Sequence, residues 1–184
     1  MLAVTVSVLA STGCTLSHPD APTTTPPPAL PSRPRDVPVD NFDPCSALDQ
    51  QSRSLLGIGM PSMNPSRADD TPGSRRCSWR ANSSTAYISY SVETSARAGA
   101  GPALQTPGAS STVVAGFPAV RTRNPYAPRG SQCIFVIDVA DTQALVVTYF
   151  INNGGSDSTD EQACQKARTA AEFAMQTLIR QAGG

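Results

Sequence analysis

Two long apolar runs in the second half of the chain give its clearest structural pattern. Residues 134–140 and 144–151 are mostly apolar, and the short segment Asp141, Thr142 and Gln143 separates them. Apolar runs joined by so few residues are typical of a β-hairpin that is buried inside a sheet. We therefore expect these two strands at the centre of the sheet.

Weaker patterns predict further strands upstream of this hairpin. Residues 86–93 alternate apolar and polar side chains, as a half-buried strand does. Another strand is expected to begin at Cys77, and residues 112–115 should form an extended segment that breaks and restarts at Gly116. Two stretches rich in glycine and proline are predicted to be irregular, the second with at most a short helical turn: residues 57–73 and 96–111.

Helix signals occur at both ends of the presumed domain. Asp43 and Pro44 have the residue types of an N-cap and a first helical position, and Gly57 would end this helix. Ser158 and Glu161 form a candidate capping box for the last helix. The apolar residues of that helix recur at helical spacing: Cys164, Ala167, Ala171, Ala174, Met175, Leu178 and Ile179.

These elements predict an α+β fold, with a mostly antiparallel sheet on which an N-terminal and a C-terminal helix pack. The part of the chain after residue 41 is long enough for one hydrophobic core and too short for two. We assign residues 42–184 to a single α+β domain.

The N-terminal residues indicate export and lipid attachment. Residues 1–10 are apolar or small, and the small residues at positions 11–13 lead directly to Cys14. A bacterial lipoprotein signal ends in this way, before the cysteine that receives lipid. We expect residues 1–13 to be a signal peptide and Cys14 to be lipidated; the alternative is an ordinary secretory signal. No basic residue precedes the apolar run, so we expect the natural start to lie further upstream.

Proline and threonine dominate the segment that follows, residues 14–41. A proline-rich chain favours polyproline II, which extends by about 3.1 Å per residue, so this tether could hold the domain up to about 80 Å from the membrane. The expected location is the extracytoplasmic face of the cell membrane, with the lipid as anchor. The charge is balanced at 14 basic and 14 acidic residues, which argues against nucleic acid as a partner.

Four cysteines remain after Cys14 is set aside for lipid: Cys45, Cys77, Cys133 and Cys164. An even set in an exported protein predicts two disulfides, for which three pairings exist. We favour Cys45 with Cys77 and Cys133 with Cys164, because each pair closes a loop of about 30 residues. A metal site is disfavoured because no two cysteines have the close spacing of zinc ligands and the domain lacks histidine.

Several short motifs occur in a defined order between residues 43 and 179: Asp43-Pro44-Cys45, Cys77-Ser78-Trp79, Gly116-x-Pro118-Ala119, Cys133 followed by Asp138-Val139-Ala140, and Cys164. Together they resemble a family of actinobacterial, largely mycobacterial and nocardial, cell-envelope lipoproteins that carry a domain of unknown function. The resemblance implies an exported lipoprotein with paired cysteines. It implies no activity and no catalytic residues.

Composition argues against catalysis. The only histidine is His18, in the predicted tether, so the domain has no Ser-His or Cys-His pair. Asp69 and Asp70 are adjacent carboxylates in a predicted loop, where solvation is expected. Asp138 interrupts the apolar run of a predicted central strand, and we expect it to lie at an edge or to pair with an arginine. The prediction is a protein that is not an enzyme and needs no cofactor or metal.

Three function classes therefore stay open, of which an enzyme that uses carboxylates or a metal is the most disfavoured. The first is a binding or interaction module for an unknown protein of the cell envelope. The alternative is a carrier of a lipid or other small apolar ligand, held in a cavity between sheet and helix. We expect Trp79 and Tyr90 to be core aromatics before a binding platform. The alanine-rich terminal helix suits close packing on the sheet, which leaves little room for a large cavity and so favours the first function.

Overall fold

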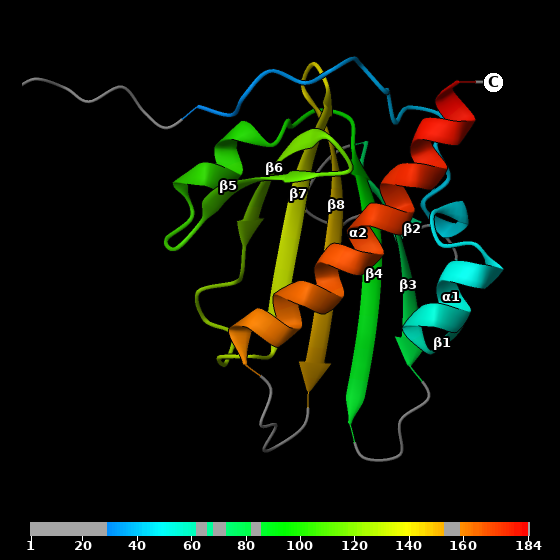
Figure 1. Ribbon diagram of the computed structural model, residues 1–184, viewed down its shortest axis with the longest axis vertical. Coiled ribbons are helices and arrows are strands. Elements are labelled where there is room, and N and C mark those ends of the chain that lie inside the picture. Colours follow the sequence, from blue (N-terminus) through cyan, green and yellow to red (C-terminus); the bar gives the residue numbers. More distant parts are fainter. Residues whose placement is uncertain (1–28, 62–65, 68–72, 82–85, 153–158, 184) are drawn as a thin grey trace, which may run out of the picture.

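The computed structural model describes residues 29–61, 66–67, 73–81, 86–152 and 159–183. Eight antiparallel strands form one sheet in the order β1-β3-β4-β8-β7-β6-β5, with β2 paired to β3, and a long helix crosses one face of it (Figure 1). The predicted α+β class is confirmed. The elements are η1 (Pro44–Ser46), α1 (Gln50–Leu56), β1 (Ile58–Pro61), β2 (Ser66–Arg67), β3 (Arg75–Ala81), β4 (Tyr87–Ser95), η2 (Gly101–Gln105), β5 (Ser110–Val114), β6 (Phe117–Thr122), β7 (Gln132–Ala140), β8 (Gln143–Asn152) and α2 (Asp160–Ala182).

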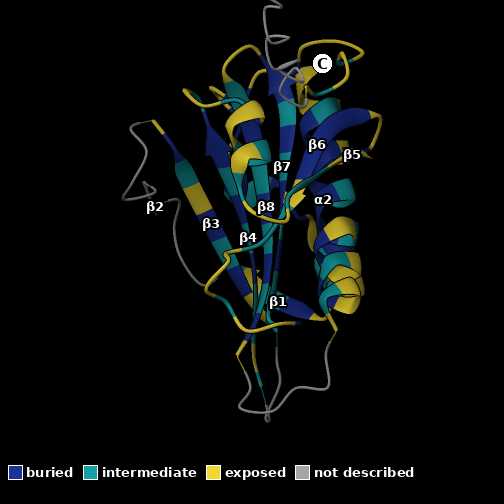
Figure 2. Cartoon of the chain, turned by 90° about the vertical axis from the view of Figure 1, so that its left-hand side faces the viewer, coloured by how far each residue is buried: buried dark blue, intermediate teal, exposed yellow. Residues whose placement is uncertain are grey.

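The central hairpin is confirmed as β7 and β8. The two strands pair from Gln132 opposite Phe150 to Ala140 opposite Gln143, and β8 lies between β7 and β4 in the middle of the sheet. Their apolar side chains are buried along most of their length (Figure 2). Buried residues alternate with half-buried ones along both strands, because α2 covers one face of the sheet and the other face is only partly covered.

Strands β5 and β6 form a tight hairpin whose loop is Ala115 and Gly116. Both loop residues have positive φ, 49° and 85°, as a type I′ turn requires. Such a turn is closed by a hydrogen-bonded pair, here Val114 opposite Phe117. Hydrogen-bonded and non-hydrogen-bonded pairs therefore alternate from this point along β5.

This alternation determines which backbone groups of β5 face away from β6. Val113 lies opposite Pro118 and Ser111 opposite Val120, and both pairs fall at non-hydrogen-bonded positions. Pro118 is tolerated there because this pair needs no N–H from it. The N–H and C=O groups of Ser111 and Val113 consequently point outward from the edge of the sheet.

Helix α2 begins one residue later than the sequence suggested. Its N-cap is Thr159, whose side chain accepts from the Gln162 N–H while the Gln162 side chain accepts from the Thr159 N–H. The predicted box of Ser158 and Glu161 is thus replaced by one shifted by one residue, and Ser158 lies outside the described residues. The buried face of α2 is mostly alanine: Ala163, Ala167, Ala170, Ala171, Ala174, Met175, Thr177 and Leu178.

The predicted N-terminal helix from Asp43 to Gly57 is wrong in its first half. The chain forms the single turn η1 after Asp43 and then starts again as α1, with Asp49 as its N-cap and Gly57 at its end with φ of 66°. The Asp49 carboxylate accepts from the Ser52 N–H at 2.8 Å. A second aspartate able to cap the backbone allows the break, and Cys45 is held by its disulfide to β3.

The stretch predicted as a loop, residues 57–73, contains two short strands where it is described. β1 pairs with β3, with Ile58 opposite Ala81, and β2 pairs with Arg75 and Arg76 of the same strand. Pro61 ends β1 at the edge of the sheet, where a missing N–H is tolerated. The glycine- and proline-rich composition of this stretch therefore did not predict its edge strands.

The folded part also begins earlier than residue 42. Val37 and Val39 are fully buried, and the Val37 N–H donates to the Val139 carbonyl at 2.7 Å. Arg33 donates to Asp36 and Asp138 at 2.7 Å each and also to Asp141, which raises the pKa of the guanidinium above its usual value. The end of the predicted tether 14–41 thus packs on the domain, and Asp138 has the arginine partner that was expected.

Both predicted disulfides are confirmed. Cys45 pairs with Cys77 and joins η1 to β3, and Cys133 pairs with Cys164 and joins β7 to α2. Each bond connects an element of the helical layer to a strand of the sheet.

We predict that Asp49→Ala lowers the free energy of unfolding by about 1 kcal/mol at pH 7, because α1 loses its N-cap. Asp49→Asn is the matched control, since asparagine also caps. Hydrogen bonds from Ser52 lower the pKa of Asp49 below its usual value of 3.8. The advantage of aspartate over asparagine should therefore be complete above that value and disappear as the pH falls through the folded pKa. Denaturation curves at pH 7 and pH 3 would test this, and equal stability of all three proteins at pH 7 would contradict it.

Candidate functional site

A cleft separates the first turns of α2 from strands β5 and β6; we call it the β5–α2 cleft. Its volume is about 640 Å³. Strand residues line one wall and helix residues the other: Ser110, Ser111, Thr112, Arg121, Phe135, Glu161, Cys164, Gln165 and Arg168. A smaller cavity of about 160 Å³ shares Arg121, Glu161 and Cys164 with it.

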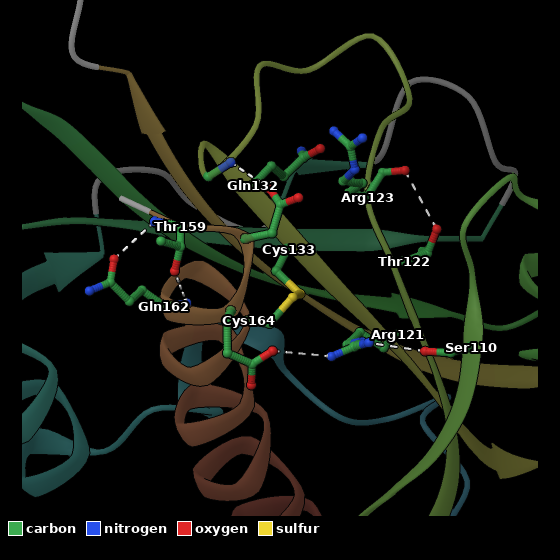
Figure 3. The surroundings of a disulfide bond; sticks show 12 residues. Ser110, Arg121, Thr122, Arg123, Gln132, Cys133, Thr159, Gln162 and Cys164 are labelled. Atoms are coloured by element: carbon green, nitrogen blue, oxygen red, sulfur yellow. Dashed lines mark hydrogen bonds and ion pairs between the residues drawn. A yellow bond between two sulfur atoms is a disulfide. The ribbon is translucent and has the colours of Figure 1, made fainter. Parts of the chain in front are cut away.

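The Cys133–Cys164 disulfide holds the helix over the sheet at this place (Figure 3). Cys133 is fully buried in β7, while Cys164 is half-buried and reaches the cleft. Because the bond joins the first turns of α2 to a central strand, it fixes the width of the cleft next to it.

Arg121 ties the two walls together at one end of the cleft. Its Nε donates to the Ser110 hydroxyl at 3.3 Å, and its Nη1 lies 3.5 Å from the Glu161 carboxylate. The second distance is long for a charge-assisted hydrogen bond, which is usually about 2.7–2.9 Å. The Arg121 side chain is 44 % exposed, and its ion pair with Glu161 is therefore weak.

Arg168 forms the tie at the other end. It is an α2 residue, and its Nη2 donates to the backbone carbonyl of Val113 at 2.8 Å, while its Nε donates to Glu172 at 3.1 Å. The Val113 carbonyl is one of the outward-pointing groups of β5. The open edge of β5 therefore faces α2 across the cleft.

The two ties also give the relative direction of the walls. Ser110 lies at the level of Glu161 and Val113 at the level of Arg168, so β5 and α2 run the same way. Seven helical residues and three strand residues each extend about 10 Å. The two arginine contacts are therefore about 10 Å apart along both walls of the cleft.

The lining offers hydrogen-bond donors and acceptors together with two guanidinium groups. Hydroxyls come from Ser110 and Thr112, an amide from Gln165, and one carboxylate from Glu161. In the parts of the chain that the structure describes, no three or more His, Cys, Asp or Glu residues are grouped to hold a metal ion. The arrangement suits binding through polar contacts.

The other residues singled out from the sequence lie elsewhere. Cys14, His18, Asp69 and Asp70 fall outside the described residues, so the lipid site and the loop carboxylates stay predictions. Asp138 lies near the far end of β7 from Cys133, bound to Arg33. It does not line the β5–α2 cleft.

The two predicted core aromatics, Trp79 and Tyr90, belong to a row across the sheet that continues with Tyr149. Trp79 lies opposite Tyr90, Tyr90 opposite Tyr149, and Tyr149 opposite Cys133, all buried. The rings of Tyr90 and Tyr149 meet edge to face at 5.1 Å, and the Lys166 ammonium lies 5.4 Å from the centre of the Tyr149 ring. Burial, with a smaller effect of Tyr149, raises the pKa of Tyr90 to about 12.

Two polar atoms of this row have no hydrogen-bond partner among the described residues: Trp79 Nε1 and Tyr149 Oη. A buried donor without a partner is unusual in a folded protein. Neither atom could be identified as orphaned from the sequence, because its surroundings depend on how distant elements pack.

A comparison with protein families matches residues 9–177 to the family described as protein of unknown function (DUF3558). The chain belongs to this family. The match confirms the domain of unknown function that the motifs implied. No curated protein and no solved structure gave a match. None of the described helices of this DUF3558 protein has the length and hydropathy needed to span a membrane.

Sequence reasoning missed the residues that form the cleft. In the sequence, Arg121 has the character of an ordinary solvated surface arginine, and no side chain of residues 110–114 marks the outward-facing backbone of β5. One signal was present: Ala115-Gly116 between two extended segments, followed by Pro118, indicates a two-residue hairpin and fixes which groups of β5 face outward. The approach of α2 had no such signal.

Proposed function

We propose that this DUF3558 protein is a non-enzymatic binding module, lipid-anchored at the extracytoplasmic face of the cell membrane. The β5–α2 cleft is its binding surface, and the partner is a protein of the cell envelope. Cys14 carries the lipid.

Two features support export. The apolar N-terminal run leads to Cys14 in the manner of a lipoprotein signal. The two disulfides, Cys45–Cys77 and Cys133–Cys164, suit an oxidising compartment outside the cytoplasm.

The observation that carries the binding function is the open cleft with polar walls. Its hydroxyl, amide, carboxylate and guanidinium groups match the mixed donors and acceptors of a polypeptide better than the chains of a lipid. The Cys133–Cys164 bond holds one wall in place, so little ordering is needed when a partner binds.

The carrier function has one observation in its favour. Tyr149 Oη and Trp79 Nε1 lack partners among the described residues, and a ligand held between sheet and helix would supply them. Against it, Phe135, Leu145, Met175 and Leu178 are buried at 1 % exposure or less, as in a packed core.

Photo-crosslinking in cells tests the binding function. A benzoylphenylalanine in place of Gln165, an exposed helix residue in the cleft, should crosslink one defined envelope protein. The matched control replaces Gln176, an exposed glutamine on the same helix that is not part of the cleft lining. Mass spectrometry would identify the product. Equal crosslinking from both positions, or none from Gln165, would contradict the proposal.

The lipid anchor predicts a clear fractionation result. Cys14→Ser should move the protein from the membrane fraction to the culture supernatant and abolish incorporation of labelled palmitate, because one thiol carries the acyl chain. Ser17→Ala, three residues downstream, should change neither. A Cys14→Ser protein that stays with the membrane would show that another feature anchors it.

Native mass spectrometry of the exported chain tests the carrier function. A carrier should retain a small molecule that is lost on denaturation, and Tyr149→Phe should reduce its occupancy by removing the Tyr149 hydroxyl. In an empty domain, Tyr149→Phe should leave the melting temperature unchanged or raise it, because the lost hydroxyl has no partner. Tyr90→Phe serves as the control of similar size. An unliganded mass would reject the carrier.

A further inference from the structure

We propose that the β5–α2 cleft binds an extended peptide segment as an additional strand on β5, with a carboxylate side chain of the peptide beside Arg121. This inference rests on the proposed function and adds the chemistry of the partner. It requires a free strand edge, an edge that faces the cleft, and room for an extended chain.

The edge is free over most of its length. The type I′ turn places the N–H and C=O of Ser111 and Val113 on the outer side of β5. Among the described residues, only the Val113 carbonyl has a hydrogen-bond partner on that side, the Arg168 guanidinium. Both groups of Ser111 and the N–H of Val113 are left to bond another strand.

The free groups face the cleft. Along β5 the side chains of Ser110 and Thr112 are half-buried, and those of Ser111 and Val113 are exposed on the opposite face. Ser111 nevertheless lines the cleft together with Ser110 and Thr112. Since its side chain points to the other face, Ser111 contributes its backbone to the cleft wall.

Arg168 shows that the edge accepts a donor from outside the sheet. Its Nη2 lies 2.8 Å from the Val113 carbonyl, a distance typical of a backbone hydrogen bond between strands. The guanidinium thus occupies the place that a peptide N–H would take. It also protects the edge near the hairpin and limits an added strand to the part toward Ser110.

The length of the cleft sets the length of the bound segment. The ties at Arg121 and Arg168 are about 10 Å apart, which corresponds to about three residues of extended chain. Alternate side chains of such a segment would point toward Cys164 and Gln165 of α2, with Phe135 as the floor of the cleft. This is strand addition next to a helix, in which backbone bonds give affinity and the helix side gives selectivity.

The charges of the cleft favour a carboxylate on the segment. Arg121 is 44 % exposed, and its nearest carboxylate, Glu161, is 81 % exposed at 3.5 Å. Glu161 can turn to solvent with little loss, since such a pair contributes little. An acidic side chain at the level of Ser110 would then replace it in a shorter contact with Arg121.

The probe is a phage library of random eight-residue peptides, selected on the exported full chain. Selected peptides should share an acidic residue, and Arg121→Gln should abolish that preference, whereas Arg80→Gln, on the far side of the sheet order, should retain it. If peptides selected on Arg121→Gln kept the acidic residue, as those selected on Arg80→Gln should, the assigned role of Arg121 would be overturned.

Ser111→Pro tests the strand pairing directly. Proline removes the outward N–H of Ser111 and leaves the bonds between β5 and β6, so the fold should be retained. Binding of a selected peptide should weaken at least about tenfold, because a hydrogen bond is lost and the ring blocks the edge. Ser111→Ala is the matched control, since it removes only a hydroxyl on the other face, and its affinity should match the unmodified protein.

Two further measurements keep the test independent of how Ser111→Pro folds. Saturating peptide should slow amide hydrogen exchange at Ser111 and Val113, and N-methylation of the selected peptide should weaken binding at alternate residues only. Uniform sensitivity to N-methylation, or unchanged exchange at Ser111, would overturn strand addition.

The remaining outcomes separate this inference from the proposed function. Thr112→Trp fills the cleft. If the selected peptides bound Ser111→Pro normally but no longer bound Thr112→Trp, strand addition would be rejected and the cleft would remain a binding surface. A dimer that Ser111→Pro dissociates would identify a second copy as the occupant and overturn the inference. A library without binders would overturn it as well, while crosslinking at Gln165 would still decide the proposed function.

Discussion

The contact between α2 and the two central strands is the one on which the rest of this structure depends. Alanines along the buried face of the helix let its backbone approach β7 and β8 closely, and the Cys133–Cys164 bond fixes its position along β7. The aromatic row Trp79, Tyr90 and Tyr149 ends at this same cysteine. Because α2 cannot shift, the space that it leaves beside β5 stays open as a cleft.

Much of the fold could be predicted because its strongest signals are local. The apolar runs of β7 and β8 and the alternation in β4 depend only on neighbouring residues. The even count of cysteines predicted two disulfides, and their spacing favoured the observed pairing among the three that were possible. The predictions failed where contacts with residues distant in the sequence determine the local structure. Residues 33–39 have the composition of a linker, and distant groups make them part of the domain, among them Asp138, the Val139 carbonyl and the Gln143 side chain. The helix predicted from Asp43 is interrupted, and α1 begins at a second N-cap, Asp49. Local residue preferences do not show which of the two aspartates begins the helix.

The candidate site was less predictable than the fold for a related reason. Its walls come from residues 110–112 and 161–168, about 50 positions apart, and their side chains are ordinary polar types without a chemical signature. Catalytic sites are recognised from rare combinations such as a histidine beside a nucleophile. A strand edge is recognised from backbone groups, which every sequence has, and only the turn at Ala115 and Gly116 specifies which of them are free.

The cluster around Arg33 has a mechanical consequence. Arg33 bonds Asp138 and Asp141 at the end of β7 that is remote from Cys133, so the chain leaves the domain toward its N-terminus at that corner. In the proposed anchored protein, tension along the tether would act first on these ion pairs and on the bond between Val37 and Val139, before any strand of the sheet bears load. Under such tension the tether would pull on the domain at this corner, and the N-terminal end of α2 would be directed away from the membrane.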